Sequence, residues 1–101
     1  MERLIMEKTV ESHSRRAVTL EYVDAPGKNV AVAGSFNDWQ PVKKLSDRNG
    51  DGHYRCRLML YPGEYFYKFV VDGEWRSDSA NKNFVPNEYG SLNSVLIVKA
   101  K

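Results

Sequence analysis

Two tryptophans in this 101-residue chain stand among residues that can hydrogen-bond to a polar ligand. Trp39 ends the stretch GSFNDW, and Trp75 closely follows the dipeptide DG at 72–73. A flat aromatic ring beside amides and hydroxyls suits a ligand with an apolar C–H face and a rim of hydroxyl groups. A pyranose sugar has that form, so the pattern indicates a sugar-stacking surface.

A loop tryptophan also has a purely structural interpretation. Tryptophan side chains are largely buried on average, and a single ring at the end of a β-sandwich can close its core. That interpretation suits one tryptophan considered alone. Two tryptophans on the outer side of predicted turns favour a binding role instead.

Most of the chain after Arg15 alternates between apolar and polar residues, as half-buried β-strands do. The segments RAVTLEYV, NVAVAG, HYRCRLMLY and SVLIVK predict strands, and clusters of glycine, proline, asparagine and aspartate separate them. We predict an all-β fold over residues 15–101, an immunoglobulin-like antiparallel β-sandwich of about seven strands. For residues 1–14, a tail, a short helix and an extra edge strand all remain open.

The segment YPGEYFYKFVVDGEWRS predicts a β-hairpin that turns at 72–73, because aspartate and glycine suit the positive φ angles of a two-residue loop. This loop pairs Val70 with Trp75. Since side chains alternate along a strand, Lys68 and Trp75 then share the outer face. The opposite face supplies the expected core residues, which are Tyr65, Tyr67, Phe69 and Val71.

Charge and composition argue against several classes of function. The net charge is +2 and the basic residues are scattered, so a nucleic-acid-binding groove is not expected. No apolar run is long enough to span a membrane, and no secretory signal is expected from the first residues. The single cysteine, Cys56, allows no internal disulfide and fits a reducing compartment, so we expect a cytoplasmic protein.

Candidate metal and catalytic sites are weak. The stretch DRNGDG at 47–52 matches the first half of a calcium loop, but Leu58 stands where the bidentate glutamate belongs, so a turn is predicted. His13 and His53 have no partner at ligand spacing, and no pair of carboxylates is singled out for glycoside hydrolysis. We expect no metal, no cofactor and no enzymatic activity.

Three segments in order, VAVAGSFNDW, YPGEYFYKFVVDGEW and NEYGSLNSVLIV, resemble the glycogen-binding domain of the AMP-activated protein kinase beta subunit. They also resemble the related starch-binding and isoamylase N-terminal modules of carbohydrate-binding module family 48. The resemblance covers about residues 17–99, and three motifs in register are more specific than one alone. It implies an early-set immunoglobulin-like sandwich that binds α-1,4-linked glucans without catalysis.

The same resemblance implies a set of binding residues. Two of them depart from the kinase subunit, because Tyr89 replaces its leucine and Ser91 its threonine. The serine keeps the hydroxyl, whereas the effect of the tyrosine on preference for helical, branched or cyclic chains is open. The sugar-binding residues implied are Trp39, Lys68, Trp75, Tyr89, Ser91 and Asn93.

Two functions are carried forward as expectations. The first is non-catalytic binding of glycogen-like or starch-like glucans, which localises an associated enzyme or kinase. The alternative is a protein-interaction or regulatory module of a kinase complex or amylase-type enzyme, with little or no sugar binding. The expected partners are therefore an α-glucan and either a kinase complex or an attached catalytic domain. The residues leave open whether the chain is free-standing or part of a larger protein.

Overall fold

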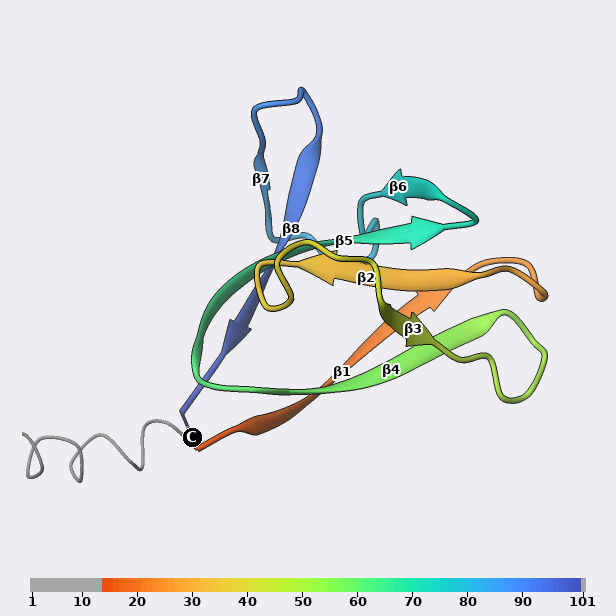
Figure 1. Cartoon of the computed structure of the whole chain (residues 1–101), viewed down its shortest axis with the longest axis horizontal. Helices are drawn as coiled ribbons and strands as arrows, with labels where there is room; N and C mark the ends of the chain where they lie inside the picture. Colours follow the sequence, from red (N-terminus) through yellow and green to blue (C-terminus); the bar gives the residue numbers. More distant parts are fainter. Residues whose placement is uncertain (1–13, 101) are drawn as a thin grey trace, which may run out of the picture.

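The computed structural model describes residues 14–100, and this part of the chain forms strands and loops without a helix (Figure 1). Residues 1–13 lie outside the described residues. They include His13 and all but the last residue of the segment 1–14, for which a tail, a helix and an edge strand were left open. The strands are β1 (Arg16–Val23), β2 (Val30–Gly34), β3 (Lys43–Leu45), β4 (His53–Leu60), β5 (Gly63–Val71), β6 (Glu74–Arg76), β7 (Phe84–Pro86) and β8 (Leu92–Val98).

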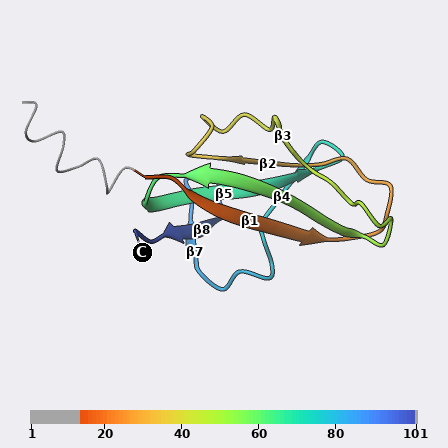
Figure 2. The same ribbon diagram turned by 90° about the horizontal axis from the view of Figure 1, so that it is seen from below.

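The strands of the described region form two antiparallel sheets. β1 pairs with β4 along its whole length, and the larger sheet has the order β3-β2-β5-β8-β7, with β6 added to β5. In Figure 1 the β1–β4 pair lies below β2 and β5, and in Figure 2, seen from below, the pair lies in front of β5. The predicted all-β antiparallel sandwich is confirmed.

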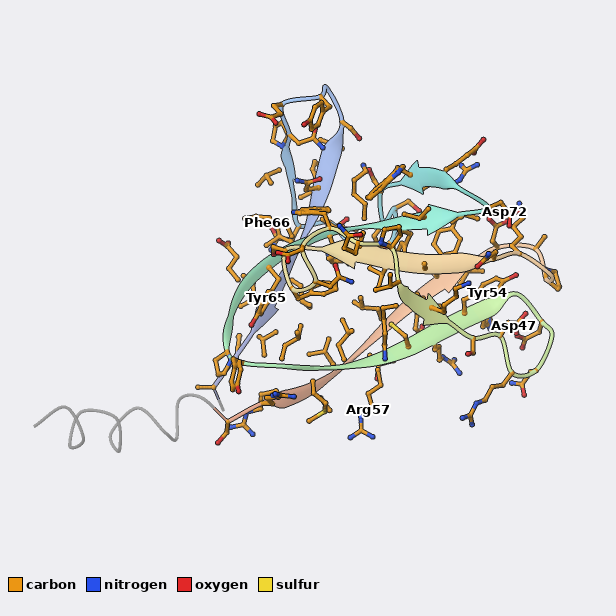
Figure 3. All side chains as sticks on the ribbon, viewed as in Figure 1. Asp47, Tyr54, Arg57, Tyr65, Phe66 and Asp72 are labelled. Carbon is orange, nitrogen blue, oxygen red and sulfur yellow. The ribbon has the colours of Figure 1, made fainter. Side chains whose placement is uncertain are left out.

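The hydrophobic core lies between the two sheets, as the alternating sequence pattern requires (Figure 3). β4 is the clearest case, because its residues alternate between buried and exposed from His53 to Met59 and Arg57 points away from the core. The buried side chains of the core are Leu20, Val30, Val32, Leu45, Tyr54, Cys56, Leu58, Tyr67, Phe69 and Val71.

The hairpin between β5 and β6 has the predicted register. Val70 faces Trp75, and the turn residues Asp72 and Gly73 have φ angles of 50° and 86°. The turn is also fixed to the neighbouring β1–β2 loop, because the Asp72 carboxylate accepts a hydrogen bond from the backbone N–H of Asn29. This register places Trp75 on the outer face of the larger sheet.

The sequence analysis did not predict the short strands β3 and β7, and β7 is the harder of the two to detect. It lies within the polar segment before β8 and pairs with β8 from Phe84 to Pro86. All three of its residues are exposed. A three-residue edge strand that buries none of its side chains leaves no alternating pattern to detect.

The stretch at 47–52 forms the predicted turn. The Asp47 carboxylate accepts hydrogen bonds from the backbone N–H groups of Asp51 and Gly52. Across residues 14–100, no group of three histidine, cysteine or acidic side chains is placed to hold a metal ion. The same part of the chain contains no helix able to cross a membrane.

Candidate functional site

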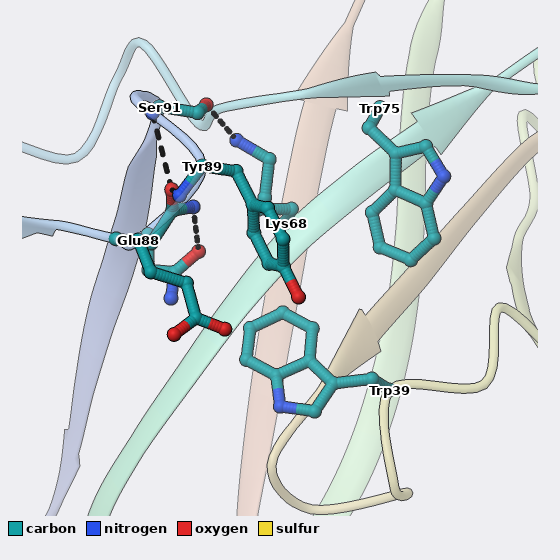
Figure 4. A pocket seen from close by; sticks show the side chains of 8 residues that line it. Trp39, Lys68, Trp75, Glu88, Tyr89 and Ser91 are labelled. Carbon is teal, nitrogen blue, oxygen red and sulfur yellow. Dashed lines mark hydrogen bonds between the residues drawn. The ribbon is translucent and has the colours of Figure 1, made fainter.

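A groove of about 740 Å³ lies on the outer face of the larger sheet (Figure 4). One wall comes from the β2–β3 loop, the floor from β5, a second wall from β6 and a third from the β7–β8 loop. The structure brings all six sequence-implied residues to this groove and adds two that were not singled out. The lining residues are Trp39, Lys68, Trp75, Asn87, Glu88, Tyr89, Ser91 and Asn93.

The β2–β3 loop holds Trp39 by a network that begins at the end of β2. The Asn37 carboxamide oxygen accepts the N–H of Gly34 at 2.9 Å, and the N–H of Trp39 donates to the Gly34 carbonyl at 2.8 Å. Asp38 and Trp39 adopt φ angles of 56° and 58°, a left-handed conformation that is unfavourable for residues with a side chain. The hydrogen-bonded loop therefore fixes the backbone at Trp39, whose side chain is half-buried.

Gly34 lets this loop approach β5 closely. A Cβ atom at Gly34 would lie 2.4 Å from the carbonyl oxygen of Phe66 and 2.7 Å from the ring of Phe36. The neighbouring Ser35 exchanges hydrogen bonds with the backbone of Phe66, at 2.9 Å through its N–H and 3.0 Å through its hydroxyl. The wall that carries Trp39 is therefore tied to the strand that forms the floor.

Lys68 forms the floor of the groove and is 7% exposed. Its ammonium group donates three hydrogen bonds, to the hydroxyls of Ser77 at 3.1 Å and Ser91 at 2.7 Å and to the carbonyl of Leu92 at 2.8 Å. Desolvation lowers the pKa of Lys68 below its ordinary value. Because an ammonium has three N–H donors, the protein already uses all of them.

Because protein acceptors occupy all three N–H donors of Lys68, its expected role as a sugar contact needs an exchange of partners. A sugar hydroxyl can accept a hydrogen bond from this ammonium only by replacing Ser77, Ser91 or the backbone of Leu92. In the structure the lysine joins β5 to the segment after β6 and to the start of β8. Its direct contact with sugar stays a prediction.

Asn87 organises the β7–β8 loop and was missed in the sequence analysis. Its carboxamide oxygen accepts the backbone N–H groups of Tyr89 at 2.9 Å and Ser91 at 3.1 Å. Its carboxamide nitrogen donates to the side-chain oxygen of Asn93 at 3.1 Å. Asparagine bonding the backbone two residues on is a recognised turn signal, so the sequence NEYGS did contain this information.

Two side chains at the tip of this loop project into solvent beside the groove. Tyr89 is 84% exposed, and Glu88 is also exposed. Figure 4 shows the rings of Tyr89, Trp39 and Trp75 standing around Lys68, with the Glu88 side chain directed toward Trp39. Nothing in the sequence distinguished Glu88, because an exposed glutamate in a loop is ordinary.

Several polar groups at the groove have no partner among residues 14–100. They are the indole N–H groups of Trp39 and Trp75, the hydroxyl of Tyr89, the carboxylate of Glu88 and the amide nitrogen of Asn93. The groove thus combines three flat rings with free donors and acceptors. This is the chemistry that complements a ligand with both C–H faces and hydroxyl groups.

Comparison with known proteins decides the family. The family model described as the glycogen recognition site of AMP-activated protein kinase matches residues 16–101. The chain belongs to this family. Glycogen-recognition domains of this family are non-catalytic carbohydrate-binding modules, and the family expected from the sequence motifs is confirmed.

Several curated relatives of this glycogen-recognition domain are kinase subunits. Pig 5'-AMP-activated protein kinase subunit beta-1 is 37% identical over 73 residues, which cover 72% of this chain and 57% of that sequence. Human subunit beta-2 is 32% identical over 94 residues, 93% of this chain and 34% of that sequence. The rice protein FLOURY ENDOSPERM 6, chloroplastic, is 42% identical over 53 residues, 52% of this chain and 10% of that sequence.

A solved structure supports the fold of the domain. Maltogenic amylase from S. marinus superimposes with a TM-score of 0.67 and 24% identity, covering 87% of this chain and 14% of the amylase. The chain thus spans from about a tenth to just over half of the relatives named here. A chloroplastic relative beside kinase subunits means that the family itself does not fix one compartment, so the cytoplasmic location stays a prediction.

Proposed function

We propose that this domain binds α-1,4-linked glucans, such as glycogen or starch-like chains, without catalysing a reaction on them. The observation that carries the proposal is the groove in which the rings of Trp39, Trp75 and Tyr89 surround a polar floor. The domain's membership of a glycogen-recognition family supports the choice of glucan over other ligands with hydroxyl groups.

The rings and the free polar groups have separate tasks in this proposal. The faces of Trp39 and Trp75 stack on the C–H faces of successive glucose units, and Tyr89 contacts the chain from the opposite wall. Asn93, Ser91 and the indole N–H groups exchange hydrogen bonds with sugar hydroxyls. Lys68 supports the floor and contacts sugar where a hydroxyl replaces one of its serine partners.

The expected affinity is weak. Each stacked ring contributes on the order of 1 kcal/mol beyond the burial of its surface. Ordering a flexible glucan costs part of that gain, which leaves dissociation constants of roughly micromolar to millimolar. Binding of this strength is suited to holding an associated kinase or catalytic domain on a polymer that offers many sites.

The second candidate is a protein-interaction module with little sugar binding. It is favoured by the relatives that are kinase subunits and by the outer face of β4, where Arg55, Arg57 and Met59 are exposed. Titration with maltoheptaose separates the two candidates. Tryptophan fluorescence that does not respond to this sugar favours the interaction module.

The direct test of glucan binding is Trp75→Ala on an amylopectin affinity gel. Because Trp75 is 48% exposed and lies on the outer face, we expect loss of retention with an unchanged thermal midpoint. Met59→Ala is a matched control, since Met59 is also 48% exposed but lies on β4, away from the groove. Normal retention of the Trp75 variant contradicts the proposed site.

A further inference from the structure

We infer that Glu88 makes the groove select uncharged glucan segments over segments that carry phosphate esters. The inference rests on the proposed function and names the ligand class more narrowly. Glu88 would be a specificity-determining residue, because it lines the groove and its carboxylate is free of partners among residues 14–100.

Of the two charged groups at the groove, a ligand can reach one far more easily than the other. Within the described part of the chain, Lys68 and Glu88 are the charged members of the groove lining. The ammonium of Lys68 is buried and donates all three of its hydrogen bonds to the protein. The carboxylate of Glu88 is exposed and uncommitted, so the accessible charge at the groove is negative.

A free carboxylate distinguishes between two kinds of glucan. It accepts hydrogen bonds only, and the hydroxyls of a neutral glucose unit can donate to it. A phosphate ester carries between about 1.5 and 2 negative charges at neutral pH and offers acceptor oxygens, so it gains no hydrogen bond from Glu88 and is repelled by it. The same side chain therefore stabilises one ligand and disfavours the other.

The loop holds Glu88 in place. The residues on either side of it are fixed by the Asn87 carboxamide, which accepts the backbone N–H groups of Tyr89 and Ser91. The side chain is directed toward Trp39, one of the rings proposed to stack on sugar (Figure 4). These hydrogen bonds position the backbone from which the Glu88 side chain projects.

The positive charge of Lys68 is poorly placed to attract a phosphate ester and so to compensate for its repulsion by Glu88. A phosphate oxygen reaches the ammonium only by displacing Ser77, Ser91 or the carbonyl of Leu92 from a nearly buried site. Such a phosphate would also lose much of its own hydration, which is unfavourable for a charged group. The groove is therefore built for the neutral chain.

The experiment is a calorimetric titration with two probes, maltoheptaose and maltoheptaose bearing a 6-phosphate ester on a glucose unit. We expect the wild-type domain to bind the neutral probe about threefold to tenfold more tightly at low salt, and the difference to shrink as salt increases. Glu88→Gln keeps the size of the side chain and should bring the two affinities to within about twofold. Glu88→Lys should reverse the preference.

Glu64→Gln is the matched control. Glu64 is an exposed glutamate on β5 that does not line the groove, so its variant should retain the wild-type preference. Equal binding of both probes by the wild-type domain overturns the inference about Glu88 while leaving glucan binding intact. An unchanged preference in Glu88→Gln does the same. Failure of the wild-type domain to bind either probe overturns the proposed function together with this inference.

Discussion

Consecutive side chains of β5 point to opposite faces of the larger sheet, and the two faces differ in what covers them. On the inner face, Tyr67 and Phe69 are fully buried against the second sheet. On the outer face, Lys68 is almost as buried, but loops cover it instead of a sheet, and the exposed Trp75 lies beside the same face. The exposed fraction of a side chain therefore does not distinguish a core residue from a groove residue. The distinction is whether a sheet or loops cover that side chain.

Tyr67 and Lys68 show how the same physical effect acts on both faces. Desolvation raises the pKa of the Tyr67 phenol and lowers the pKa of the Lys68 ammonium. Both shifts favour the neutral form. Each buried polar group is hydrogen-bonded. The Tyr67 hydroxyl donates to Asp78 and accepts from Asn81, and the Lys68 ammonium donates to two serine hydroxyls and a carbonyl.

The largest expected effect belongs to the inner face. Phe69→Ala removes a ring that is 0% exposed and should lower the free energy of unfolding by about 3–5 kcal/mol, measured by urea denaturation. Val23→Ala provides the control, because Val23 is 66% exposed and its truncation should change stability by at most about 0.5 kcal/mol. A Phe69 variant as stable as the Val23 variant would show that the core lies elsewhere.

Gly34→Ala should lower both the stability of the domain and its affinity for maltoheptaose. Its new methyl group would meet the backbone of β5 at Phe66, so overpacking should cost about 1–3 kcal/mol of stability. The loop that carries Trp39 begins at Gly34, and we therefore expect weaker binding of maltoheptaose as well. Urea denaturation and calorimetry measure the two losses.

Gly50→Ala is the control for the effect of backbone conformation. Gly50 has a φ of 67° but open space around its missing Cβ, so its variant should lose about 1–2 kcal/mol from the left-handed backbone alone and bind maltoheptaose normally. Equal behaviour of the Gly34 and Gly50 variants would contradict the role assigned to close packing at Gly34.

Asn87→Ala should weaken binding with a smaller effect on stability. The change removes three side-chain hydrogen bonds that shape the loop carrying Tyr89. We expect about threefold to tenfold weaker binding of maltoheptaose by calorimetry, and about 1 kcal/mol lower stability. Asn87→Asp keeps the acceptor oxygen and should retain more of the affinity. If both variants bind like wild type, the loop does not contribute to the site.

The smallest effect should appear in the dependence of stability on alkaline pH. Above the ordinary Tyr pKa of 10.0, the unfolded chain loses the phenol proton that folded Tyr67 keeps, so stability falls with rising pH. Folded Lys68 releases its proton before the unfolded chain does at 10.5, so its contribution to stability rises with pH in the window below that value.

Urea midpoints measured from about pH 8 to about pH 11 should separate these opposing contributions. Tyr67→Phe should reduce the fall in stability, and Lys68→Met should remove the rise. The comparison concerns slopes, because both substitutions also change stability at neutral pH by removing hydrogen bonds. Slopes identical to wild type in both variants would mean that neither group titrates differently on folding.

Local patterns were sufficient to predict the framework of the site. The turn at Asp72 and Gly73 determines the register of the hairpin, and alternation then assigns Lys68 and Trp75 to one face. The alternation in HYRCRLMLY likewise predicted a half-buried strand, and β4 buries Cys56 on its inner face. These features depend on neighbours in the chain, which is why the sequence alone could predict them.

Features that depend on distant segments were not predictable in this way. Alternation places Lys68 on the outer face but does not indicate that Ser77 and Leu92 will cover it. The edge strand at Phe84–Pro86 forms only because β8 provides its partner. Bringing Trp39 and Tyr89 to one groove likewise requires the complete larger sheet, and only the resemblance to a known family linked them in advance.

The walls of the groove come from three separate stretches of the chain, and the last of them lies against β8. During synthesis, Trp39 and Trp75 leave the ribosome before the segment that completes the surface around them. β8 must then pair with β5 before Lys68 acquires its carbonyl partner on Leu92 and the loop bearing Tyr89 takes its place. A nascent chain therefore completes this groove only after β8 has paired with β5.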